Sequence, residues 1–94
     1  MHFDDVDYAG HTYGFSPYVA EYLSSIEEVD NYVGNILQAV QQRPNYSNED
    51  WLVLITTDHG GINTSHGGNT IEEKDVFLVA GGDNVNPVSY THLT

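Results

Sequence analysis

Five side chains in two short motifs have the types and spacing of metal ligands. Asp58 and His59 directly follow an apolar run, and His66 comes after a glycine-rich turn. Upstream, Asp7 and His11 form a second Asp/His pair, four residues apart. Carboxylate oxygens and imidazole nitrogens together suit a hard-to-borderline divalent cation. The two motifs therefore predict a metal site, provided that the fold brings them together.

A long helix is predicted between the two motifs. Ser16 as N-cap and Pro17 at the first helical position indicate its start, and Pro44 stops it after Arg43. Apolar residues recur at spacings of three and four, which is typical of an amphipathic helix with one face on a sheet. These residues are Tyr22, Ile26, Val29, Val33, Ile36, Leu37 and Val40.

Three strands are predicted around this helix. Residues 1–6 are interpreted as the end of a first strand, and Trp51 to Thr56 and Asp75 to Ala80 as apolar strands covered on both faces. Ile71 to Lys74 is expected to form one helical turn. Strand, helix and strand predict a parallel βαβ unit, in which ligands bind beyond the carboxyl ends of the strands. Both Asp/His pairs should then share one edge of the sheet.

The composition excludes several classes of function. The chain has fourteen acidic residues and two basic ones, Arg43 and Lys74, so nucleic-acid binding and docking on an anionic membrane are not expected. There is no cysteine for a disulfide or a thiolate site, and no apolar run of about 18 residues that could span a membrane. Four glutamates are assigned to solvated surface: Glu27, Glu28, Glu72 and Glu73.

The chain is divided into a partial catalytic, metal-binding domain over residues 1–82 and a tail over residues 83–94. The tail does not continue the pattern, and Pro87 to Thr94 resembles translated adapter sequence at the end of an assembled fragment. His92 is therefore given no function.

Taken together, the motifs resemble the alkaline phosphatase superfamily, with the type I phosphodiesterase/nucleotide pyrophosphatase group as the nearest branch. The resemblance rests on Asp7-x-x-x-His11, a helix of this length, Thr57-Asp-His-Gly60 and His66-Gly-Gly. It implies an α/β fold, as part of an α/β/α sandwich with a largely parallel sheet.

The same resemblance implies two divalent metal ions, with zinc as the expected metal. Asp7, His11 and His66 would hold one ion, and Asp58 and His59 would hold part of the other. The family's Thr or Ser nucleophile and one further Asp ligand have no counterpart in this chain. The chain is thus expected to be an inactive fragment of a larger enzyme, which the resemblance would place in the periplasm or outside the cell.

The expected activity of that enzyme is metal-dependent hydrolysis of a small phosphodiester or pyrophosphate. A sulfatase is one alternative, since its motifs also include Asp-His-Gly and His-Gly. A phosphoethanolamine transferase is another, suggested by residues 66–73, and it would require membrane spans elsewhere. A metal-binding fragment without catalysis is the third.

Overall fold

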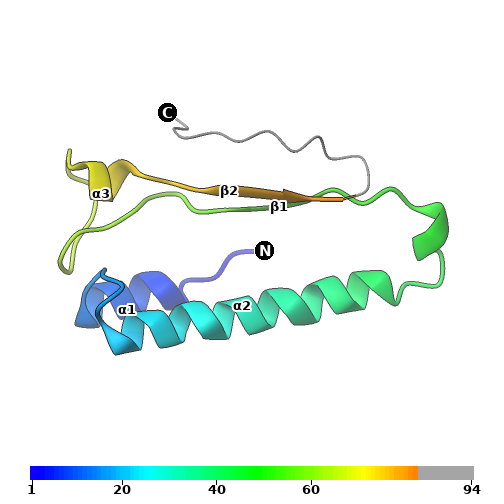
Figure 1. The fold of residues 1–94 in the computed structure, drawn as a ribbon, viewed down its shortest axis with the longest axis horizontal. Coiled ribbons are helices and arrows are strands. Elements are labelled where there is room, and N and C mark those ends of the chain that lie inside the picture. Colours follow the sequence, from blue (N-terminus) through cyan, green and yellow to red (C-terminus); the bar gives the residue numbers. More distant parts are fainter. Residues whose placement is uncertain (83–94) are drawn as a thin grey trace.

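The computed structural model describes residues 1–82, so the predicted tail lies outside the described part. Two helices form one layer, and two strands with a short helix form the other (Figure 1). The elements in chain order are α1 (Asp5–Tyr13), α2 (Ala20–Gln41), the 3-10 helix η1 (Tyr46–Asn48), β1 (Val53–Thr56), α3 (Ile71–Lys74) and β2 (Leu78–Gly81).

The long helix is confirmed as α2, although its start was misplaced. Ser16 lies in a turn before the helix, where its carbonyl oxygen accepts the Val19 amide at 3.1 Å, and Val19 is the N-cap. The apolar stripe is half-buried along the helix, except that Ile26 is 43% exposed and Ser25 is buried in its place. Ser25 tolerates burial because its hydroxyl donates to the Tyr22 carbonyl oxygen at 2.6 Å.

The predicted first strand is wrong, because its end and the following residues form helix α1. Asp5 and Asp7 lie in the first turn and His11 in the last, an arrangement that complements the helix dipole. Gly14 ends the helix at a φ of 122°, and its amide donates to the Gly10 carbonyl oxygen at 2.9 Å. A six-residue apolar pattern is too short to separate a strand from a helix terminus.

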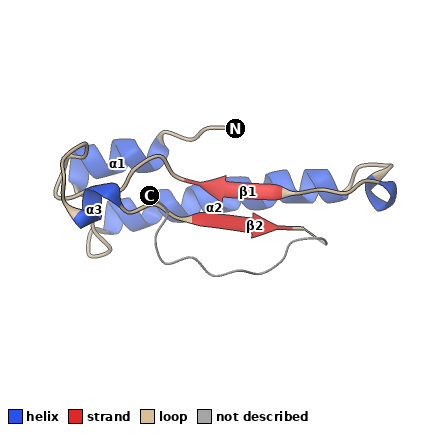
Figure 2. Cartoon of the chain, turned by 90° about the horizontal axis from the view of Figure 1, so that it is seen from above, coloured by secondary structure: helices blue, strands red, loops and turns tan. Residues whose placement is uncertain are grey.

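The prediction of a parallel βαβ unit is also wrong for residues 1–82. β1 and β2 pair in antiparallel register, with Val53 opposite Gly81 and Thr56 opposite Leu78 (Figure 2). The expected unit joined residues 1–6 to residues 51–56 through the long helix, and it does not form because residues 1–6 contain no strand. The helical turn at Ile71–Lys74 is confirmed, and both strands are shorter than predicted.

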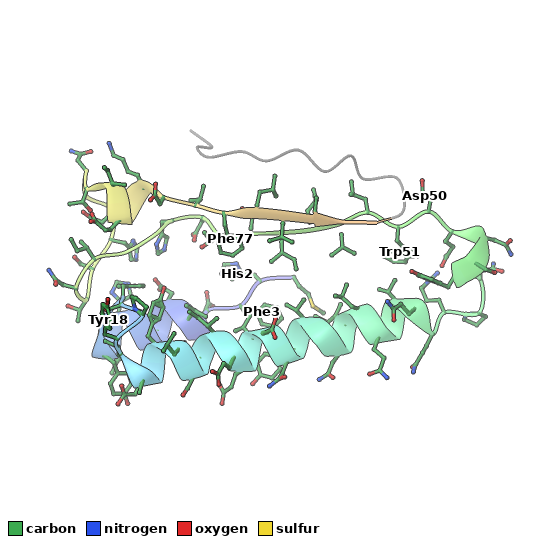
Figure 3. The ribbon with its side chains drawn as sticks, in the orientation of Figure 1. His2, Phe3, Tyr18, Asp50, Trp51 and Phe77 are labelled. Atoms are coloured by element: carbon green, nitrogen blue, oxygen red, sulfur yellow. The ribbon has the colours of Figure 1, made fainter. Side chains whose placement is uncertain are left out.

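The apolar strands are not covered within the described residues. Leu54 is 58% exposed and Val79 is 52% exposed, while Ala9 is the only buried hydrophobic residue among residues 1–82. The N-terminal segment runs between the two layers, where Phe3 stacks on Tyr32 with ring centroids 5.8 Å apart (Figure 3). No helix in this part of the chain is long and apolar enough to cross a membrane.

Candidate metal centre

One oxygen of Asp7 lies at the centre of three histidines. Asp7 Oδ1 is 3.4 Å from His11 Nε2, 3.5 Å from His59 Nε2 and 3.3 Å from His66 Nε2. This oxygen is shielded from solvent and accepts no hydrogen bond. Burial of a polar atom without a hydrogen-bond partner costs free energy, and a bound cation would offset that cost here.

Helix α1 sets the spacing of the first two side chains. Asp7 and His11 are four residues apart and therefore lie on the same face of the helix. The loop between β1 and α3 carries His66 to them. Asp7, His11 and His66 each offer a ligand atom, and these atoms all lie within 4.8 Å of one another. This is the trio predicted for the first ion.

Backbone carbonyl groups orient two of the imidazole rings. His11 Nδ1 lies 2.9 Å from the Thr64 carbonyl oxygen, and His59 Nδ1 lies 2.6 Å from the Gly60 carbonyl oxygen. A carbonyl oxygen can only accept, so each Nδ1 carries the proton in the neutral ring. Each Nε2 then keeps its lone pair and faces Asp7, which is the usual outer-shell arrangement for a metal-ligating histidine.

The two predicted halves of the site form one continuous cluster. The ring of His59 stacks on His66 with centroids 3.7 Å apart and an interplanar angle of 17°. His59 Nε2 is also 3.5 Å from Asp58 Oδ1, although the Asp58 side chain is 77% exposed. Asp58 thus lies at the margin of the cluster, with His59 between it and the Asp7 trio.

The ring of Phe15 packs against two of the histidines. Its ring meets His11 edge-on at 5.3 Å and His66 at 6.1 Å. A methyl group added at Gly10 or Gly61 would overlap this ring, so the absence of side chains there lets it lie close to the backbone. Phe15 therefore packs against these histidines, and it is also among the residues that line a cleft beside the site.

Tyr22 borders the cluster from α2. Burial raises the pKa of the Tyr22 hydroxyl, and the charge of Asp7 raises it further. Together with His2, Thr57 and Asp58, Tyr22 lines a cleft of about 130 Å³ beside the histidines. Small-molecule sites usually enclose about 300–1,000 Å³, so this cleft is only part of a substrate site.

Glu73 was misassigned to solvated surface, because its side chain is buried. Its carboxylate accepts hydrogen bonds from the Thr70 hydroxyl at 2.7 Å and the Gly68 amide at 2.7 Å. The Thr70 hydroxyl and the Gly68 amide both lower the pKa of Glu73, the hydroxyl more strongly. The signal for this role was in the sequence: Thr70-x-x-Glu73 is a capping box, and α3 begins with one.

The donor set fits a divalent cation. Asp7 offers a carboxylate oxygen with no other partner, and His11 and His66 offer imidazole nitrogens to the same space. One carboxylate and two or three neutral imidazoles are ligands that zinc accepts. The described residues thus form a centre suited to a borderline metal ion, on an α1/loop scaffold.

Comparisons with known proteins assign the chain to a family. A family model described as Type I phosphodiesterase / nucleotide pyrophosphatase matches residues 1–91. The chain therefore belongs to this family, which lies in the alkaline phosphatase superfamily, and the resemblance inferred from the motifs is confirmed. The match extends past residue 82 into the segment predicted to be a tail.

A curated relative is the GPI ethanolamine phosphate transferase 1 of Aspergillus oryzae (strain ATCC 42149 / RIB 40). It is 34% identical over 93 residues, which is 98% of this chain but 9% of the relative. The chain thus spans about a tenth of the length of that protein. No solved structure matches the chain.

Proposed function

We propose that this chain is the metal-binding segment of a larger enzyme that cleaves phosphoric esters by hydrolysis. The observation that carries the proposal is Asp7 Oδ1, buried, without a hydrogen bond, and within 3.5 Å of three imidazole nitrogens. Membership in the phosphodiesterase family supports the reaction class. The larger enzyme would complete the α/β/α sandwich and supply the largely parallel sheet.

Two divalent cations, with zinc favoured, are assigned to the cluster. Asp7, His11 and His66 would hold the first, and Asp58 and His59 would contribute to the second. When bound, such ions supply the positive charge that stabilises the oxyanions of phosphoryl transfer. Arg43 does not offer this charge locally, because it is paired with Glu49 after the C-terminal end of α2.

The chain's own residues prepare the site rather than attack the substrate. Two of the nearby hydroxyls are already engaged: Thr57 Oγ1 donates to the His59 carbonyl oxygen at 3.1 Å, and Thr56 Oγ1 donates to the Phe77 carbonyl oxygen at 2.6 Å. This supports a Thr or Ser nucleophile contributed by another part of the enzyme. The segment alone should therefore not turn over a small-molecule phosphate ester.

The test uses the full-length enzyme that contains this segment. We expect hydrolysis of bis-p-nitrophenyl phosphate to stop on removal of metal by a chelator and to return with added zinc. The sulfate analogue, p-nitrophenyl sulfate, should remain intact, which separates this enzyme from a sulfatase. Activity that is indifferent to chelation would reject the proposal.

Transfer of phosphoethanolamine is a second candidate function. It is favoured by one observation, the 34% identity to an ethanolamine phosphate transferase over nearly the whole chain. Hydrolysis and transfer differ in the acceptor, which is water in one case and an alcohol in the other. Phosphorus NMR of a reaction containing an ethanolamine-phosphate donor and an added alcohol would show which product forms.

A further inference from the structure

The Glu73 side chain holds the loop that follows His66. Its Oε2 accepts the Gly68 amide at 2.7 Å, and its Oε1 accepts the Thr70 hydroxyl at 2.7 Å and the Thr70 amide at 3.4 Å. Three donors from two residues thus converge on one buried carboxylate. Such charge-assisted hydrogen bonds are stronger than those between neutral groups, so this part of the loop is fixed against α3.

The Glu73 backbone holds the loop that carries His59. The Gly60 amide donates to the Glu73 carbonyl oxygen at 3.0 Å. Gly60 is also the residue whose carbonyl oxygen lies 2.6 Å from His59 Nδ1. A Cβ at Gly60 would overlap the Glu72 carbonyl oxygen and lie 2.9 Å from that of Asp75, so the two backbones touch without room for a side chain.

Glu73 therefore connects the His59 and His66 ends of the β1–α3 loop without reaching the ligand cluster. Both of its carboxylate oxygens are occupied by loop donors, and it is not among the grouped ligand atoms of Asp7, His11 and His66. Its lowered pKa keeps it an ionised acceptor. The neighbouring Glu72 is exposed, so the two adjacent glutamates have different roles.

We propose that Glu73 is a positioning residue that holds the His59 and His66 ends of the β1–α3 loop in place against Asp7. The proposal deepens the proposed function and rests on it, since this placement matters only if these side chains bind a cation. Outer partners of this kind typically change metal affinity by about 10–100-fold.

Glu73→Gln in the full-length enzyme is the main test. A glutamine retains one oxygen for the Thr70 hydroxyl and thus the helix cap, but it turns an amide donor toward the Gly68 amide. We expect zinc affinity, measured by competition with a chromogenic chelator, to fall by about tenfold or more. The kcat at saturating zinc should change less than the zinc affinity does, because the ligands themselves are retained.

Glu72→Gln is the matched control, with the same change of charge one residue away. Its zinc affinity should equal that of the wild type. Thr70→Val is a second variant that leaves the Gly68 hydrogen bond but removes the Thr70 hydroxyl, which donates to Glu73 Oε1 and accepts the Glu73 amide at 3.2 Å, so its zinc affinity should fall by a smaller factor. Wild-type zinc affinity in both Glu73→Gln and Thr70→Val would overturn the proposal.

Amide hydrogen exchange in the metal-free enzyme gives a readout that needs no cation. Glu73→Gln should speed exchange at Gly68 and Thr70, and Glu72→Gln should not. If the wild type bound no zinc, the proposed function would fail, and this measurement would still decide whether Glu73 holds the loop. Unchanged exchange in Glu73→Gln would reject that role.

Discussion

Asp7 Oδ1 is shielded from water and accepts no hydrogen bond. In the absence of a cation, this atom loses its hydration and gains nothing in return, a cost of about 1–3 kcal/mol for a polar group and more for a charged one. Three imidazole Nε2 atoms lie within 3.5 Å of this oxygen, but they cannot all donate hydrogen bonds to it. In their neutral rings, His11 and His59 carry the proton on Nδ1, which donates to a backbone carbonyl oxygen. A bound cation would satisfy the carboxylate and the lone pairs together.

Asp7→Asn in the full-length enzyme should reduce zinc affinity by more than the roughly 10–100-fold caused by loss of an outer partner, because it removes the charged ligand itself. Asp5→Asn is the matched control, since Asp5 is exposed and lies two residues earlier in the first turn of the same helix. Isothermal titration with zinc measures both. Equal affinities in the two variants would remove Asp7 from the centre.

The sequence was sufficient to identify the residues of the cluster, because Asp and His spacing carries the chemistry directly. Asp7, His11, Asp58, His59 and His66 were all named, and the structure brings them together; their role as ligands stays a prediction. The residues that hold these side chains in place were not predicted.

The residues that hold the cluster in place were harder to predict, because their role depends on which residues lie near them in three dimensions. Glu73 was assigned to the surface from its charge, although the Thr70-x-x-Glu73 spacing indicated a cap. The close approach of the Phe15 ring to Gly10 and Gly61 is likewise a contact that only the three-dimensional structure shows.

Helix α1 and the long α2 show why elements differ in predictability. α2 has an apolar stripe over 22 residues, and its periodicity is unambiguous. α1 has nine residues, of which only Ala9 and Gly10 are buried, so its pattern carries little information. The direction of strand pairing depends on how the chain reverses between β1 and β2, which local propensity does not encode.

Substitution by alanine should have opposite effects on stability at Gly61 and at Gly34. Gly61→Ala forces a methyl group into the Phe15 ring, and overpacking of this kind costs about 1–3 kcal/mol. Gly34 lies within α2 with nothing within 4 Å of an added Cβ, so Gly34→Ala should stabilise by about 0.5–1 kcal/mol. Thermal unfolding of the full-length variants checks both signs, and a lower midpoint for Gly34→Ala would contradict this assignment.

The loop after α2 contains the pair with the clearest pH dependence. Arg43 donates two hydrogen bonds to Glu49, each at 2.9 Å, and Trp51 Nε1 donates a third at 3.1 Å. Together they lower the pKa of Glu49 to about 2. Since the folded pKa lies below the ordinary value of 4.5, the contribution to stability is complete above about pH 4.5 and is lost as the pH falls toward 2.

This contribution should be small and sensitive to salt, because the pair is exposed. Carbon-13 NMR of the Glu49 carboxyl group should give a titration midpoint well below 4.5. Arg43→Gln should move that midpoint upward, since it removes the first cause of the shift. An unchanged midpoint in Arg43→Gln would show that the pair does not form in solution.

At the scale of the whole molecule, the described residues enclose almost no core. Leu52 is 61% exposed, Ile71 71% and Phe77 52%, and the two-stranded sheet has large apolar side chains facing solvent. A two-stranded sheet is marginal by itself in water, and one helical layer covers one face at most. These surfaces support the interpretation that further elements of a larger domain complete the fold.

The isolated chain of 94 residues should therefore not fold cooperatively. We expect a broad thermal transition in circular dichroism and binding of a hydrophobic dye, because apolar strands remain uncovered. The full-length enzyme is the control and should show a sharp transition. A sharp, reversible transition in the isolated chain would contradict the expectation.

The contact between Asp7 Oδ1 and His66 Nε2, at 3.3 Å, joins two residues that lie far apart in the sequence. A cation held by both would act as a reversible cross-link that closes a loop of about 60 residues, in a sequence that has no cysteine to do so. By the loop-entropy relation used for disulfides, closure of such a loop disfavours the unfolded ensemble by about 4 kcal/mol. The same cation would then also stabilise the folded protein, so removal of metal should increase its sensitivity to proteolysis as well as abolish the proposed activity.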